Sequence, residues 1–111
     1  MFTATTPKHT FTLPLDTSEC KTIRIVYKQA VRGCGKPVKL IKEYTNGTTA
    51  PGMTLDEDTV IVRLTQLETL LFKEGNVNVQ VRVVTNGGDV IDSQIMGVSV
   101  VEAADNDILE V

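Results

Sequence analysis

Residues 77–93 read VNVQVRVVTNGGDVIDS, and the fold is decided in this stretch. Valine occupies every second position from 77 to 83, and the residues between the valines are Asn78, Gln80 and Arg82. A period of two places the valines on one face of a β-strand and the polar residues on the other. The stretch therefore predicts a strand with one buried face and one outward face that carries three polar side chains.

A hairpin is expected directly after this strand. Residues 86–88 are Asn-Gly-Gly, and these residue types accept the positive φ that tight hairpin turns require. The return strand then runs over residues 89–101. Val90 belongs to one face of it and Ile95 to the other, which predicts a β-bulge near residues 92–93.

The same alternation recurs earlier in the chain. Alternating apolar residues, separated by turn signals, predict strands over residues 10–15, 22–30 and 38–44, and two more within 53–65. Over 22–30 two sets take opposite faces, with Ile23, Ile25 and Tyr27 on one and Arg24, Val26 and Lys28 on the other. The residues expected in the core are Phe11, Leu13, Ile23, Ile25, Val60, Val62, Val77, Val79, Val81 and Val83.

Residues 65–72 are the one stretch that favours a helix. Thr65 and Glu68 form a Thr-x-x-Glu capping box, and the leucines at 67, 70 and 71 follow helical spacing. The stretch is too short to be stable alone, so one or two turns are expected to cross between sheets.

About seven short strands with one helical turn predict an all-β protein. The pattern fits an antiparallel immunoglobulin-like β-sandwich, and a small barrel is the alternative. The chain has no Trp, so it lacks the Cys…Trp…Cys framework of true immunoglobulin domains. Its 111 residues suit one domain over 9–101, with a loose lead-in over 1–8 and an acidic tail over 102–111.

Composition argues against several classes of protein. The net charge is −3, whereas phosphate binding needs clustered Lys and Arg, so no nucleic-acid partner is expected. No apolar run is long enough for a membrane span, and the first residues lack the charged start and apolar run of a signal peptide. We therefore expect a protein that is made and kept in a cytoplasm, or assembled there.

No catalytic constellation is visible. None of the serines lies in a Gly-x-Ser-x-Gly motif, and His9, the single histidine, is expected at the surface. Cys20 and Cys34 are expected as two free thiols, with a disulfide between them as the alternative. With one histidine and no Cys-x-x-Cys motif there is no ligand set for zinc, so neither a metal nor a cofactor is expected.

Four segments, in this order, resemble a known group of proteins: FTLPLDTSECKTIRIVYKQ, VRLTQLETLLF, VNVQVRVVTNGGDVIDSQIMGVSV and DNDILEV. The group consists of small virion-associated proteins encoded by tailed bacteriophages and prophages of Gram-positive bacteria. In shape it resembles the N-terminal immunoglobulin-like modules of phage baseplate and tail proteins. The resemblance runs from Phe11 to Val111, but residues 30–53 depart from it.

The resemblance implies a non-enzymatic structural protein of a tailed-phage particle, present in many copies. It would be a capsid decoration protein, a head–tail connector or a tail or baseplate component. Its partners would be other virion proteins and copies of itself, and its location the virion, after synthesis in the cytoplasm of the bacterial host. Asn78, Gln80 and Arg82 then suit a partly wet contact with a neighbouring subunit, and the alternative is an ordinary solvated sheet face.

The C-terminal tail is a second expected interface. Four carboxylate side chains surround a compact apolar group there, which suits docking onto a neighbour: the apolar group is buried on contact, and the charges select the partner and the register. The interface residues expected in the tail are Asp105, Asp107, Ile108, Leu109 and Val111. The alternatives are a tail packed on its own domain, or a frayed one.

Two other functions are weighed against the structural role. One is a β-sandwich module that binds a carbohydrate or a host surface. Sugar sites typically show exposed aromatic rings, and Tyr27 and Tyr44 are the only tyrosines. The other is an enzyme whose catalytic groups are brought together only by folding.

Overall fold

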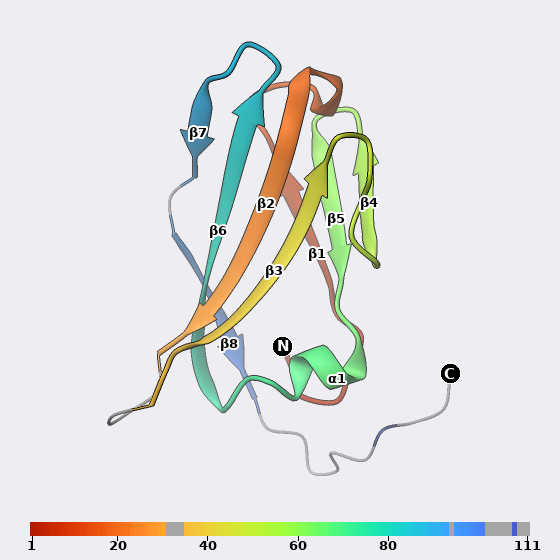
Figure 1. Ribbon diagram of the computed structural model, residues 1–111. Helices are drawn as coiled ribbons and strands as arrows, with labels where there is room; N and C mark the ends of the chain where they lie inside the picture. The colour runs from red at the N-terminus through yellow and green to blue at the C-terminus, as the bar shows by residue number, and fades with distance from the viewer. Residues whose placement is uncertain (31–34, 94, 102–107, 109–111) are drawn as a thin grey trace.

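The computed structural model describes residues 1–30, 35–93, 95–101 and 108. The protein is mostly strand, in two antiparallel sheets (Figure 1), as the alternating pattern predicts. The sheet order β1-β5-β4 is built from β1 (Lys8–Thr12), β5 (Thr59–Arg63) and β4 (Met53–Asp56). The order β3-β2-β6-β7 is built from β3 (Val38–Thr45), β2 (Cys20–Gln29), β6 (Gly75–Thr85) and β7 (Val90–Asp92), and β8 (Met96–Val100) also pairs with β6.

The two sheets enclose one apolar core. β2 and β6 supply their inward valines, isoleucines and Tyr27, and β5 supplies Val60 and Val62 from the opposite sheet. Every residue expected in the core is buried except Phe11, which is partly buried and packs against it. Core residues that the alternation did not single out are Cys20, Met53, Phe72 and Val100.

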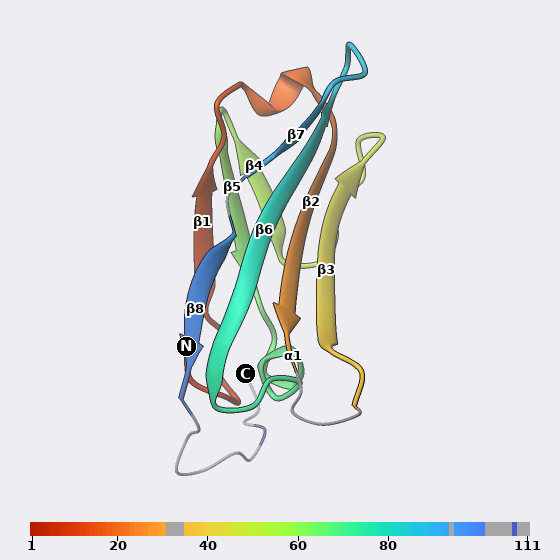
Figure 2. The same cartoon turned by 90° about the vertical axis from the view of Figure 1, so that its left-hand side faces the viewer.

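The return strand after β6 is split in two, and Figure 2 shows β7 and β8 lying one after the other along β6. Arg82 pairs with Asp92, whereas Val79 pairs with Met96. The returning chain therefore contains one residue more than β6 between these two pairs. This one-residue offset agrees with the β-bulge expected near residues 92–93, and the strand is divided into β7 and β8 there. This division gives eight strands instead of about seven in the described part of the chain.

Ser93 completes the ladder at the point where the strand divides. Its hydroxyl accepts a hydrogen bond from the Val81 backbone N–H at 2.9 Å, and its own N–H donates to the Val81 carbonyl at 2.8 Å. Ile91 before the division and Met96 after it pair with core valines, whereas Val90 before it and Ile95 after it are 61% and 63% exposed.

The first residues of the chain lie against the end of β8. Phe2 forms a parallel bridge with Val101, and Thr3 donates its backbone N–H to the Val101 carbonyl at 3.1 Å. Thr3 is buried, and β1 already begins at Lys8. The lead-in that was expected to be loose is thus attached to the domain at both ends.

Two short helical turns connect the sheets, η1 (Thr17–Glu19) and α1 (Gln66–Thr69). The capping box that starts α1 is confirmed: Glu68 N–H donates to Thr65 Oγ1 at 3.1 Å, and Thr65 N–H donates to Glu68 Oε1 at 2.9 Å. The leucines at helical spacing do not form its buried side, because Leu67 and Leu71 are 68% and 49% exposed. Thr69 and Phe72 face the core instead, and both are buried.

A buried ion pair joins β3 to α1. Lys42 occupies an inward position of β3, and its Nζ lies 2.6 Å from Glu68 Oε2 and donates to the Pro51 carbonyl at 3.1 Å. Burial alone would raise the pKa of Glu68, but hydrogen bonds from Lys42 and the Thr65 backbone, together with the Lys42 charge, outweigh it and lower that pKa. The Glu68 carboxyl is therefore favoured in its ionised form beside the Lys42 ammonium.

Gly52 and Gly47 both adopt the left-handed backbone conformation, with φ of 81° and 82°, so they can be compared directly. A Cβ at Gly52 would collide with the Arg63 carbonyl oxygen, whereas one at Gly47 would meet nothing. We expect Gly47→Ala to cost roughly 1–2 kcal/mol, from backbone strain alone. Gly52→Ala should cost about 3 kcal/mol, because the collision adds to the same strain. Chemical denaturation measures both, and equal losses would contradict the assigned contact.

Candidate protein-interaction surface

The candidate site is the face of the larger sheet that points away from the core, which we call the outer face. Residues directly opposite each other in paired strands share a face, so the register arranges the side chains in rows across β3, β2, β6 and β7. From the β6–β7 hairpin towards α1, the rows are Thr45–Thr22–Val84–Val90, Glu43–Arg24–Arg82–Asp92, Ile41–Val26–Gln80 and Lys39–Lys28–Asn78.

The second row holds two ion pairs. Arg24 Nη2 lies 2.9 Å from Glu43 Oε1, and Arg82 Nε lies 2.9 Å from Asp92 Oδ1. The two arginines are directly opposite each other, so each guanidinium has a like charge on one side and an acid on the other. All four side chains are at least one-third exposed, and ion pairs of this kind contribute only about 0–1 kcal/mol to stability. These arginines can therefore exchange their acids for those of a partner at little cost.

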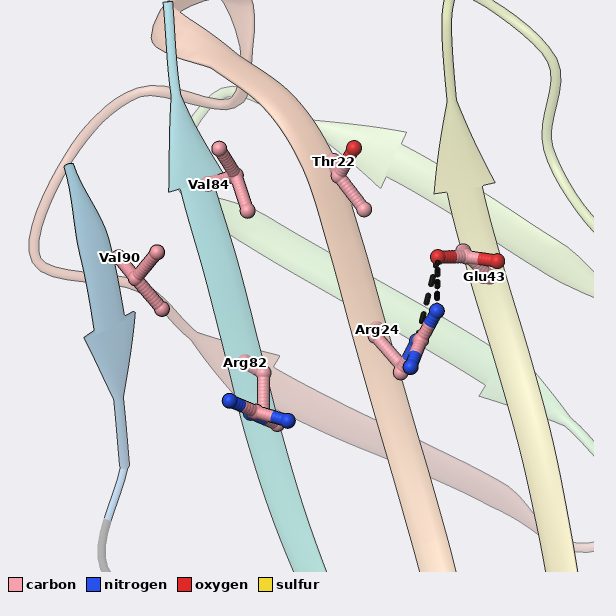
Figure 3. Close-up of a pocket in the computed structure, with 6 residues that line it drawn as sticks. All are labelled: Thr22, Arg24, Glu43, Arg82, Val84 and Val90. Atoms are coloured by element: carbon pink, nitrogen blue, oxygen red, sulfur yellow. Dashed lines mark hydrogen bonds and ion pairs between the residues drawn. The ribbon is translucent and has the colours of Figure 1, made fainter. Parts of the chain in front are cut away.

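A hollow of about 200 Å³ lies between the first two rows (Figure 3). Thr22 and Val84 line it from the central strands, Val90 from β7, and the two arginines and Glu43 complete its wall. Val90 is 61% exposed there. Apolar side chains beside arginines are the composition found at the centres of protein interfaces, which are otherwise depleted in charge.

The third and fourth rows continue this mixture towards α1. Ile41 is 40% exposed beside the partly buried Val26. Lys28 and Lys39 are exposed and directly opposite each other, and neither has an ion pair within the described part of the chain. Like charges in directly opposed positions destabilise a sheet slightly, so this row favours an anionic partner.

The three strand residues proposed from the sequence as interface residues do share this face. Asn78 and Arg82 are exposed, and Gln80 is partly buried and donates from Nε2 to the Ser93 carbonyl at 3.2 Å. Their common orientation is as the alternation predicts, and their contact with a neighbour remains a prediction.

Most of the tail residues proposed as an interface fall outside the described residues: Asp105, Asp107, Leu109 and Val111. Ile108 is described, and it lines a hollow together with Thr6, Arg63 and Leu67 at the α1 end. Its side chain is 49% exposed, so about half of its surface remains free.

His9 and Cys20, which the sequence assigns to no functional site, lie away from the outer face. His9 is not the surface residue that was expected: it points inward from β1, its Nδ1 lies 2.8 Å from the Tyr27 hydroxyl, and burial lowers its pKa. Tyr27 is fully buried, and burial, followed by the charge of Glu68, raises its pKa far above the usual range. Cys20 is a free buried thiol, and Cys34 lies outside the described residues.

The described residues hold no group of three or more His, Cys, Asp or Glu that would bind a metal ion. Within the same residues, no helix has the length and apolar character needed to cross a membrane. Comparison with known proteins yields no matching family model, no matching curated protein and no matching solved structure.

The alternation of β2 already placed Arg24, Val26 and Lys28 on one outward face. What the sequence does not indicate is that this face adjoins that of β6, which brings Arg24 against Arg82. Glu43 and Ile41 were also missed, because the register of β3 against β2 cannot be read from either strand alone.

Proposed function

We propose that the chain is a non-enzymatic structural protein of a tailed-phage particle, assembled in many copies through protein–protein contacts. The observation that carries the proposal is the outer face, where arginines, half-exposed aliphatic side chains and a hollow occur together on a broad sheet. The sequence resemblance supports a place in a phage particle, as a capsid decoration protein, a head–tail connector, or a tail or baseplate component. The partners would be other virion proteins and further copies of the chain.

The strand order supports the immunoglobulin-like form of this proposal. In such sandwiches strands B, E and D are neighbours in one sheet and C, F and G in the other. The orders β1-β5-β4 and β2-β6-β7/β8 follow the same scheme, with β3 in the place of the additional strand C′ beside C.

The particle itself provides the test. Quantitative mass spectrometry of purified virions should find the protein in many copies, and absence from virions would refute the proposal.

Val90→Glu and Ile41→Glu each place a charge at a half-exposed apolar position of the outer face. Each should reduce incorporation about tenfold or more, which corresponds to a loss of about 1.4 kcal/mol in binding free energy. Thr54→Glu adds the same charge at an exposed position of β4 in the other sheet and should incorporate normally.

No described feature favours the carbohydrate-binding alternative. Tyr27 is fully buried and Tyr44 is partly buried, so neither tyrosine offers a freely exposed ring for a sugar. Tight and specific binding on a glycan array would nevertheless replace the structural proposal.

A further inference from the structure

We infer that the outer face receives the acidic C-terminal segment, residues 102–111, of a second copy of this chain. The inference rests on the proposed function, because it names the partner of the same surface. Residues 102–111 enter it through their sequence.

The charges of the chain are divided between its body and this segment. Four of the 14 acidic residues lie in 102–111, which contains no Lys or Arg. The preceding part of the chain contains all 11 basic residues and 10 acidic ones. The segment is therefore an anion attached to a domain that is close to neutral, and a basic surface is its natural partner.

The outer face offers that basic surface. Arg24, Lys28, Lys39 and Arg82 face outward, against Glu43 and Asp92. Two pairs of like charges are directly opposed, Arg24 with Arg82 and Lys28 with Lys39, and a bound carboxylate relieves the repulsion in both. The lysine pair is the stronger attraction for an incoming acid, since it has no acid of its own among the described residues.

The order of residues on the two partners also agrees. The outward positions of β2 read Arg24, Val26, Lys28, an apolar residue between two cations. In the tail, Ile108 and Glu110 are two positions apart, so in an extended chain they share a face, an apolar residue before an acid as Val26 comes before Lys28. Successive side chains on one face of an extended chain are about 7 Å apart, so Ile108 can lie over Val26 while Glu110 lies over Lys28.

Stacking two outer faces on each other is a poor alternative. The second row reads acid, arginine, arginine, acid, and it is symmetric about its centre. A two-fold axis through the centre of this row, along or across the strands, places arginines over arginines and acids over acids. An axis displaced by one strand opposes acids and arginines over only half of the row. A segment of opposite charge meets no such restriction, so the segment is the better complementary partner.

The hollow near α1 is the competing place for the segment, since Ile108 lines it beside Arg63 and Leu67 of its own chain. Ile108 is half exposed there, so it gains burial on moving between Ile41 and Val26 of a second copy. Docking in cis would leave the protein monomeric, whereas docking in trans joins copies head to tail.

A complementation experiment with full-length chains separates these cases. The receiver variant is Lys28→Gln/Lys39→Gln, and the donor variant is Asp105→Asn/Asp107→Asn/Glu110→Gln. In analytical ultracentrifugation at low salt we expect the wild type to form oligomers that grow with concentration. Each variant alone should associate at least about tenfold more weakly. A mixture should form a one-to-one complex and stop there, because only one productive contact remains.

Three controls sharpen the result. Lys8→Gln/Lys73→Gln removes two exposed lysines elsewhere and should associate like wild type. Leu67→Asp disrupts the competing hollow and should leave association unchanged. Raising the ionic strength from about 0.05 M to about 0.5 M should weaken the complex, because exposed charges are screened. Unchanged melting temperatures verify that every variant is folded.

The inference is overturned if the wild type stays monomeric at millimolar concentration, if the mixture fails to associate, or if Leu67→Asp and not the lysine variant abolishes association. Its failure is distinct from failure of the proposed function. A monomeric protein that is nevertheless abundant in purified particles refutes the inference alone. A protein that complements as expected but is absent from particles refutes the proposed function alone.

Discussion

Val81→Asp is expected to leave the protein unfolded at room temperature and neutral pH. Val81 is 4% exposed and lies between the sheets, with Ile25 opposite it on β2. A carboxylate there has no partner, and burying an unpaired ionised group costs several kcal/mol even after relaxation. That cost is comparable with the whole stability of a small domain, about 5–15 kcal/mol.

Circular dichroism measures this outcome directly. Asn78→Asp places the same charge at an exposed position of the same strand and should change the stability by no more than about 0.5 kcal/mol. Acidification should partly restore Val81→Asp, because the introduced carboxyl becomes neutral on protonation. A melting curve equal to that of wild type would show that Val81 does not face the core.

Glu68→Gln is expected to cost about 3 kcal/mol, a loss typical of breaking a buried ion pair. The change leaves the Lys42 ammonium, whose side chain is 7% exposed, without its counter-charge. Gln at the third helical position still accepts a hydrogen bond from the Thr65 N–H, so the capping box of α1 is retained. The variant therefore removes the negative charge and little else. Glu43→Gln removes the acid of the exposed pair with Arg24 and should cost less than about 1 kcal/mol.

The same pair predicts a dependence on pH. Because the pKa of Glu68 is lower in the folded protein, the stability that its ionisation supplies is fully present above the ordinary carboxyl pKa. It is lost as the pH falls through the folded pKa. Wild type should therefore lose more stability on acidification than Glu68→Gln, and their unfolding free energies should converge. Parallel curves, or a cost for Glu68→Gln as small as for Glu43→Gln, would contradict the assigned role.

Alternation in the sequence predicted the strands because a half-buried strand has apolar residues on its buried face and polar residues on its exposed face, so the pattern lies within the strand itself. The valines of β6 and the isoleucines of β2 were placed correctly for this reason. β3 is the counterexample: Ile41 faces water and Lys42 faces the core, against their hydropathy. Lys42 is accommodated there by Glu68, which lies 26 residues further along the chain, and no local pattern reports such a partner.

The candidate site shows the same limit. Asn78, Gln80 and Arg82 could be assigned to one outward face from β6 alone. The row that joins Arg82 to Arg24 and Glu43 depends on which strands are neighbours and in what register, and long-range pairing sets both. His9 was misplaced for a related reason, because its partner Tyr27 lies on the other sheet.

The divided return strand has a consequence for how copies could join edge to edge. On that side of the larger sheet, β7 presents only three residues, and β8 is covered at its end by the first residues of the chain. Their registers differ by one residue, so no single straight strand can pair with both. The opposite edge, β3, is eight residues long and continuous, and Thr48 and Ala50 already form backbone hydrogen bonds with its end at Thr45 and Glu43. Edge-to-edge growth of a sheet needs a free and regular edge on both sides of every copy. Among the described residues this sheet has such an edge only over residues 38–42 of β3, so pairing there joins two molecules and does not propagate.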